Sequence, residues 1–281
     1  MKGAGKWWLG GLVLLMSGMV RTVEAGRASY RGPYPYFLYA GVEQYDWQEF
    51  SGSGTTLDRE SGPLLTVGGG VSNLRQATHG LVYRAGIRLY GGTIDYDGQT
   101  LGGTPLTTYS DYTGATVAGL AGLRFGRQQR GIDLFAGGGL DSWLRSLRDA
   151  RTVNGTPAYG YSEQYDILYG ELGAGLFGNY GSWSWRIRAG GKYPLYTFEH
   201  VNLGDGFNLF PGRELSGFAR ASLEFGPPDR PHLGLSASYD SFRFSASSPE
   251  LLTFSGTPDG YYIQPRSHQD IYGISATYYF R

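Results

Sequence analysis

The chain has 281 residues with 24 basic and 24 acidic side chains, a balance that gives no sign of a nucleic-acid-binding protein. It contains no cysteine, so disulfide frameworks and thiolate metal sites are excluded. Its 47 glycines and 23 tyrosines favour a fold made of many strands.

Residues 1–25 have the pattern of a secretory signal peptide. Lys2 and Lys6 precede an apolar run from Trp7 to Val20, and the small residues around Ala25 suit cleavage there. The run is shorter than the roughly 20 residues of a membrane-spanning helix. We therefore predict a signal peptide over 1–25 and one mature domain over 26–281.

Ten later segments alternate apolar or small residues with polar ones. In chain order they cover residues 36–47, 64–72, 81–90, 115–125, 132–145, 165–177, 183–195, 215–225, 233–242 and 270–280. The clearest places Trp183, Ile187 and Leu195 on one face and Arg186 and Arg188 on the other. Such alternation predicts strands, and their length suits a tilted crossing of a membrane. An even number of strands places both chain ends on the same side.

The connections alternate between short and long. Residues 73–79, 126–131, 179–182 and 226–231 are short turns, whereas 48–63, 95–107, 146–162, 199–213 and 243–267 are long. This asymmetry is typical of barrels in the outer membrane of Gram-negative bacteria. We predict an all-β fold, a closed antiparallel up-and-down transmembrane barrel with short periplasmic turns and long external loops.

Aromatic residues near the strand ends are predicted to form belts at the membrane interfaces. They are Trp47, Trp143, Tyr165, Trp183, Trp185, Tyr193, Tyr272 and Tyr278.

The faces opposite the apolar ones are predicted to line the lumen, because a charge facing lipid at the midplane costs roughly 2–4 kcal/mol. They carry a charge network of Glu43, Arg84, Arg88, Arg124, Asp133, Asp141, Arg145, Glu171, Arg186, Arg188, Lys192, Arg220, Glu224 and Asp240. Because the signs nearly balance, we expect ion pairs that block the lumen. A narrow small-solute pore lined by arginines is the alternative.

Two acidic motifs follow strands. Asp95-Tyr96-Asp97 ends the third strand and Glu199-His200 ends the seventh, and two such pairs facing each other could activate a water molecule. With its ten strands, the chain is similar here to the omptin family of outer-membrane proteases, although Phe198 stands where that family has an aspartate. The resemblance implies an aspartate/histidine endopeptidase with Asp95, Asp97, Glu199 and His200 as catalytic residues.

Structural readings of these motifs compete with catalysis. Asp-Tyr-Asp-Gly is an ordinary turn sequence, and the histidines show no metal-ligand spacing that we recognise. We therefore expect an integral outer-membrane barrel without catalysis, without cofactor and without metal, whose surface loops serve structural or binding roles. The omptin-like peptidase and the pore remain open alternatives.

The last strand resembles the terminal recognition strand of outer-membrane barrels, with Tyr272, Ile274, Tyr278 and Phe280 on one face, although Arg281 follows. This resemblance implies delivery to the barrel-assembly machinery. Other expected partners are outer-membrane lipid and lipopolysaccharide, which loop residues 244–262 could contact. The sequence predicts no nucleic-acid partner and names no ligand.

Overall fold

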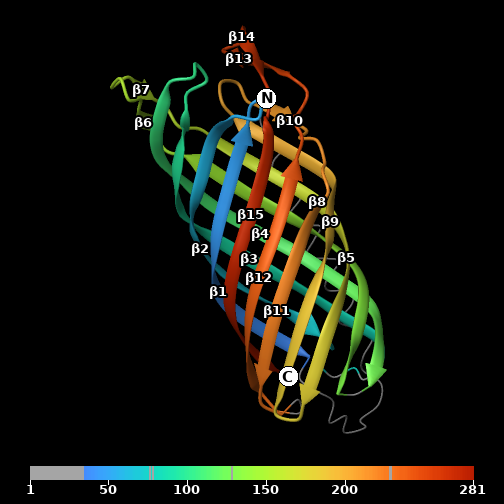
Figure 1. The fold of residues 1–281 in the computed structure, drawn as a ribbon. Helices are drawn as coiled ribbons and strands as arrows, with labels where there is room; N and C mark the ends of the chain where they lie inside the picture. The colour runs from blue at the N-terminus through green and yellow to red at the C-terminus, as the bar shows by residue number, and fades with distance from the viewer. Residues whose placement is uncertain (1–34, 76, 78, 128, 228–229) are drawn as a thin grey trace. The chain divides into compact units, whose positions relative to one another are not determined.

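The structure, a computed structural model, describes residues 35–281 apart from 76, 78, 128 and 228–229. Within this part of the chain, ten long strands pair into a closed antiparallel barrel, which confirms the predicted fold class (Figure 1). The strands are β1 (Tyr36–Phe50), β2 (Thr56–Ser72), β3 (Gly80–Gln99), β4 (Pro105–Arg127), β5 (Arg130–Leu147), β8 (Ser162–Tyr180), β9 (Trp183–Asn202), β11 (Ser216–Phe225), β12 (His232–Phe244) and β15 (Arg266–Phe280). The predicted signal peptide lies outside the described residues.

Closure follows from two pairings. The first strand pairs with the last along its whole length, from Tyr36↔Phe280 to Phe50↔Arg266, and β8 pairs with β9. A closed barrel satisfies the backbone hydrogen bonds of its strands without water, as crossing a lipid bilayer requires. The short connections and the C-terminus mark one end of the barrel, called the turn end below; the long connections mark the loop end (Figure 1).

Apart from β11, the strands run further at the loop end than the alternation predicts, so most of the loops are shorter. The predicted loop 95–107, for example, is mostly strand and keeps only residues 100–104 as a connection. Shorter strands occupy three of the other loops. They are β6 (Ala150–Arg151), β7 (Pro157–Ala158), β10 (Phe207–Leu209), β13 (Glu250–Phe254) and β14 (Thr257–Tyr262).

An apolar belt covers the outward face of the strands near the turn end. Leu65, Leu172 and Ile274 are 70%, 69% and 69% exposed, an exposure that suits lipid rather than water. Towards the loop end the outward residues become polar, as at Arg59 and Asp95. We treat the belt as the membrane-spanning part. It comprises residues 36–43, 64–72, 80–91, 114–127, 130–141, 168–180, 183–197, 216–225, 232–240 and 271–280.

Among the described residues, no helix is both long and apolar enough to cross a membrane.

Candidate functional site

The two aspartates of the Asp-Tyr-Asp motif lie on the outside of the barrel. Asp95 and Asp97 are exposed on β3, whereas the alternate residues Ile94 and Tyr96 are buried inside. In the β2–β3 register Asp97 stands opposite Arg59, another outward residue. Neither carboxylate therefore points into the barrel mouth.

Glu199 and His200 point in opposite directions, as neighbours on a strand must. Glu199 is fully buried inside, whereas His200 is exposed and its Nδ1 lies 2.8 Å from Oδ1 of Asn208 on β10. A bulge decides this orientation: Leu195 has no partner in the β8–β9 register, so the inward face changes from even to odd positions above it. The four predicted catalytic residues are thus not brought together on one face.

The predicted lumen charges are arranged largely as ion pairs. Arg88 contacts Glu43 at 3.1 Å and Asp141 at 3.3 Å, and Arg124 contacts Asp133 at 2.6 Å. Further pairs join Lys192 with Asp240 and Arg186 with Glu224. Not every lumen charge is enclosed by side chains, since Arg220 is 48% exposed although it lines the interior. That exposure marks an internal space.

The β2–β3 turn folds into the turn end of the barrel. Arg75 donates to the carbonyl of Gly226 and contacts Glu224 at 3.5 Å, while Arg186 donates to the carbonyl of Leu74 at 2.5 Å. Leu74 is 3% and Arg75 8% exposed. We call this group the turn-end plug, because buried side chains that are bonded to three strands or turns fill the opening.

An aromatic layer crosses the interior towards the loop end, and it corrects one prediction. Trp47, Trp143 and Tyr165 were expected in the interfacial belts, but they are 1–2% exposed inside the barrel. The rings of Trp143 and Tyr165 stack at 4.9 Å, and Trp47 meets Tyr165 edge-on at 5.6 Å. The layer also contains Tyr45, Tyr90, Tyr112, Tyr169, Phe242 and Phe244. The alternation along β5 gives the signal that was missed. Trp143 lies on the same face of the strand as Asp141 and Arg145, which were predicted to point inward.

A carboxylate cluster lies beyond the aromatic layer, in the part of the barrel outside the apolar belt. The guanidinium of Arg145 pairs with Glu60 and Glu163 and lies 3.9 Å from Asp58. Glu49 accepts hydrogen bonds from Trp47 and Gln264 at 3.0 and 2.8 Å. Sequence reasoning found only Arg145 and Glu199 of this cluster. Glu49, Asp58 and Glu60 lie in the segment 48–63, which was expected to be a loop, and Glu163 lies just before the predicted strand 165–177.

Glu199 is the member of the cluster whose negative charge is least balanced by neighbouring groups. It is fully buried and makes no ion pair with any described residue, and the hydroxyl of Tyr165 donates to Glu163. Burial first, and then the negative charges of Glu163 and Glu49, raise the pKa of Glu199 well above the usual carboxyl range. Burial likewise raises the pKa of Glu49 and that of Asp58. Burial and mutual repulsion therefore favour the protonated forms of Glu49, Asp58 and Glu199.

The β13–β14 hairpin is fixed to the loop between β9 and β10. Asp205 accepts hydrogen bonds from the hydroxyl of Thr253 at 2.7 Å and from the amides of Ser255 and Gly256 at 2.9 and 2.8 Å. These donors lower the pKa of Asp205, the Gly256 amide most. Ser255 and Gly256 both have positive φ, 51° and 76°, as the preferred two-residue hairpin turn requires. The apolar side chains of the hairpin point outward: Leu251, Phe254 and Tyr261 are 44%, 45% and 78% exposed.

Among residues 35–281 with the gaps given above, no group of three or more His, Cys, Asp or Glu side chains is arranged to hold a metal ion.

Comparison with known proteins gives a likeness of fold. No family model matches the chain, and no curated protein matches it by sequence. Among solved structures, the outer membrane protease OmpT from Escherichia coli aligns with a TM-score of 0.50 at 8% identity, covering 89% of this chain and 97% of that one. The fold is that of the ten-stranded outer-membrane barrels.

Two autotransporter domains also align, with lower scores. The transport unit of AIDA-I from Escherichia coli has a TM-score of 0.41 at 7% identity and covers 96% of this chain and 98% of its own. The translocator domain of NalP from Neisseria meningitidis has 0.36 at 13%, with 95% and 94% covered. At these identities no activity is carried over to this chain.

Proposed function

We propose that this chain is an integral outer-membrane barrel, exported by its first 25 residues, with a closed interior and a non-catalytic role at its loop end. The proposal rests on two obstructions at different heights in the barrel interior. The turn-end plug fills one opening, and the aromatic layer, with Trp47 and Tyr165 each 1% exposed, crosses the interior above it. A solute would have to displace both.

Electrical recording tests this closure. Purified barrel refolded into a planar lipid bilayer is expected to give no steady open-channel current, because both obstructions belong to the folded barrel. A reproducible single-channel conductance from the unmodified protein would refute the closed interior. Incubating the same preparation with basic peptides and lipopolysaccharide tests the absence of catalysis, and cleavage that disappears in Asp95→Asn would refute it.

The β13–β14 hairpin supports a binding role. Its backbone is fixed through Asp205 and its apolar side chains face outward, so little ordering is needed when a partner binds. We expect bacteria that display the barrel to adhere to a second bacterial or host cell through this hairpin. The variant with serine at Leu251, Phe254 and Tyr261 should lose adhesion. The matched control places serine at exposed apolar positions of the neighbouring loops, Leu101, Val153 and Tyr159. Equal adhesion by both variants would contradict this role.

Lipopolysaccharide is the proposed lipid partner. Arg213 and Arg266 are exposed on the loop-end side of the apolar belt, the side on which anionic headgroups of the outer leaflet would stand. Changing both to serine should remove the gain in thermal stability that lipopolysaccharide gives over phosphatidylcholine vesicles. Arg151→Ser, in the short β6 strand, is the control that should keep the gain. A gain unchanged in the double variant would exclude these two contacts.

We also propose recognition of β15 by the barrel-assembly machinery. Its outward residues Tyr272, Ile274 and Tyr278 form an exposed apolar row that ends in Phe280. Truncation of Phe280 and Arg281 should lower the amount of folded protein in the outer membrane, measured by heat-modifiable mobility, while refolding in detergent is kept. Unchanged assembly in cells would contradict this recognition.

A further inference from the structure

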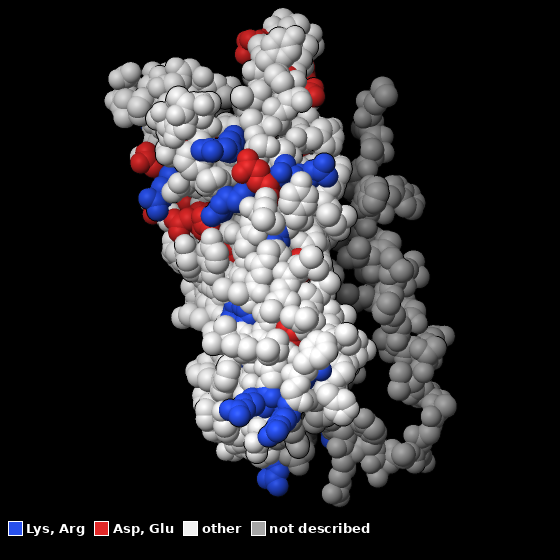
Figure 2. Space-filling model, turned by 45° about the vertical axis from the view of Figure 1, so that its right-hand side comes forward, with Lys and Arg blue, Asp and Glu red and all other residues white. Residues whose placement is uncertain are grey.

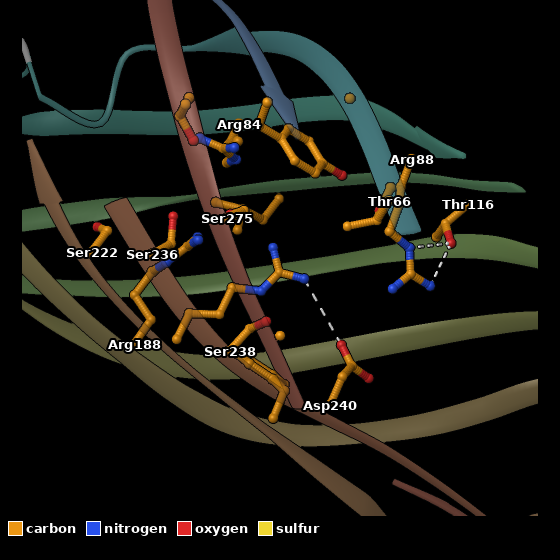
Figure 3. A pocket seen from close by; sticks show the side chains of 18 of the residues that line it. Thr66, Arg84, Arg88, Thr116, Arg188, Ser222, Ser236, Ser238, Asp240 and Ser275 are labelled. Carbon is orange, nitrogen blue, oxygen red and sulfur yellow. Dashed lines mark hydrogen bonds and ion pairs between the residues drawn. The ribbon is translucent and has the colours of Figure 1, made fainter. Parts of the chain in front are cut away.

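An internal cavity of about 180 Å³ lies between the turn-end plug and the aromatic layer. Barrels of this size are usually filled by their inward side chains. Here one part of the wall carries only small ones: Ser222 on β11, Ser236 and Ser238 on β12, and Ser275 on β15 all line the cavity (Figure 3). The sequence thus leaves space where larger side chains would close it.

The four serines form one continuous patch. In the strand register Ser222 stands opposite Ser236, and Ser236 stands opposite Ser275, while Ser238 is the next inward residue on β12. None of these hydroxyls makes a hydrogen bond with a described residue that would occupy its donor. Each is therefore available to donate into the cavity.

Arg188 faces the same cavity without a counter-ion. It is 8% exposed, and within the described part of the chain it makes no hydrogen bond or ion pair, only a distant contact with the ring of Phe135 at 5.8 Å. Directly opposite it in the β9–β11 register stands Arg220. Like charges at directly opposed positions of a sheet destabilise it.

The neighbouring charges do not remove this excess. Arg220 lies 3.9 Å from Asp240, but Lys192 already holds that carboxylate at 2.6 Å. Arg84, also on the wall, stacks over Phe37 at 3.7 Å and has no ion pair among the described residues. Glu171 is the one wall carboxylate without an ion pair in that part of the chain. Over the whole lining, cationic side chains outnumber carboxylates by one: Arg84, Arg88, Arg186, Arg188, Lys192 and Arg220 against Glu43, Asp141, Glu171, Glu224 and Asp240.

We propose that the cavity binds a small tetrahedral oxyanion, phosphate or sulfate, through Arg188 and the serine hydroxyls, with Arg84 and Arg220 completing its charge balance. A guanidinium group donates two parallel hydrogen bonds to such an anion, and hydroxyls satisfy its remaining oxygens. An anion there would also relieve the cost of an uncompensated buried cation. The rate of exchange rests on the closed interior proposed above: with both ends blocked, the anion is taken up as the barrel folds and exchanges slowly afterwards.

The uptake experiment uses molybdate as a heavy tetrahedral probe. Wild-type barrel is refolded with molybdate or with chloride at matched ionic strength, desalted and analysed for molybdenum. We expect close to one molybdate for each barrel and less than about a tenth of that in Arg188→Gln. Arg148→Gln, an arginine at the loop end outside the cavity, is the matched control and should bind like wild type. Excess phosphate during refolding should displace the probe, whereas chloride should not.

A second variant guards against a folding defect. Ser238→Val fills the cavity and removes one donor without changing any charge, so it should refold and still lose molybdate. Retention of molybdate by both Arg188→Gln and Ser238→Val would show an adventitious ion only and overturn the proposal. Failure of wild type to retain any would overturn it equally.

Discussion

Removing the charge of Arg145 should destabilise the barrel strongly. Its side chain is 4% exposed and pairs with Glu60 and Glu163, which are 0% and 2% exposed. Breaking a buried ion pair by deleting one partner costs about 3–5 kcal/mol. We expect Arg145→Gln to lose this much free energy of unfolding at pH 8, measured by urea titration of tryptophan fluorescence in lipid vesicles. Arg148→Gln, one residue beyond the end of β5 and half exposed, should be close to wild type.

The penalty should shrink as the pH falls. Burial raises the pKa of Glu49, Asp58 and Glu199 in the folded barrel, and the positive charge of Arg145 opposes that rise at each of them. A carboxyl group with a raised folded pKa stabilises the fold below its unfolded value, near 4, and loses that contribution as the pH rises through the folded value. Without Arg145 the folded values move higher still, so more stability is lost between pH 5 and pH 8. A penalty equal at both pH values, or below about 1 kcal/mol at pH 8, would refute the cluster.

Three further outcomes follow from the same contacts. Trp143→Ala should cost about 3–5 kcal/mol in urea titrations because Trp143 is buried and stacked, whereas the exposed Trp183→Ala should cost much less; equal losses would contradict the aromatic layer. Asp205→Asn should make the β13–β14 hairpin cleavable by added protease. The wild-type hairpin should become cleavable only as the pH falls below about 4, because the lowered pKa of Asp205 keeps its carboxylate charged above that pH. If the hairpin of Asp205→Asn resisted protease, the hydrogen bonds of Asp205 would not be what fixes it. Arg145→Gln and Arg188→Gln should be additive in stability to within about 0.5 kcal/mol, because no described residue pairs with both; a larger coupling would indicate one continuous polar interior.

Within the belt, the sequence was sufficient to place the strands and their faces. Lipid on one side and packed charge on the other enforce a strict alternation, so Ile187 predicts an outward face and Arg186 and Arg188 predict an inward one. Outside the belt that constraint disappears, since water accepts polar residues on the outer face. Segments such as the end of β3, where Asp95 faces water and Tyr96 is buried, therefore had the composition of loops.

The candidate site was harder to predict for two physical reasons. An aromatic ring is stable both at a membrane interface and in a packed interior, so residue type alone cannot place Trp143, although its parity can. The orientation of Glu199 depends on one extra residue, Leu195, inserted in the β8–β9 pairing. Period-two reasoning carried past an unseen bulge assigns every later side chain to the wrong face.

The interior is divided along its length by the kind of residue that faces inward. Serines and arginines line the cavity, and the aromatic layer lies above it. The carboxylate cluster follows beyond that layer, at the loop end, where several charged side chains also lie on the outer face (Figure 2). The division has an electrostatic consequence. The aromatic layer lies between the unpaired Arg188 and the unpaired Glu199, so these two charges do not pair with each other. Elsewhere on the interior wall opposite charges pair directly, as at Arg124 and Asp133.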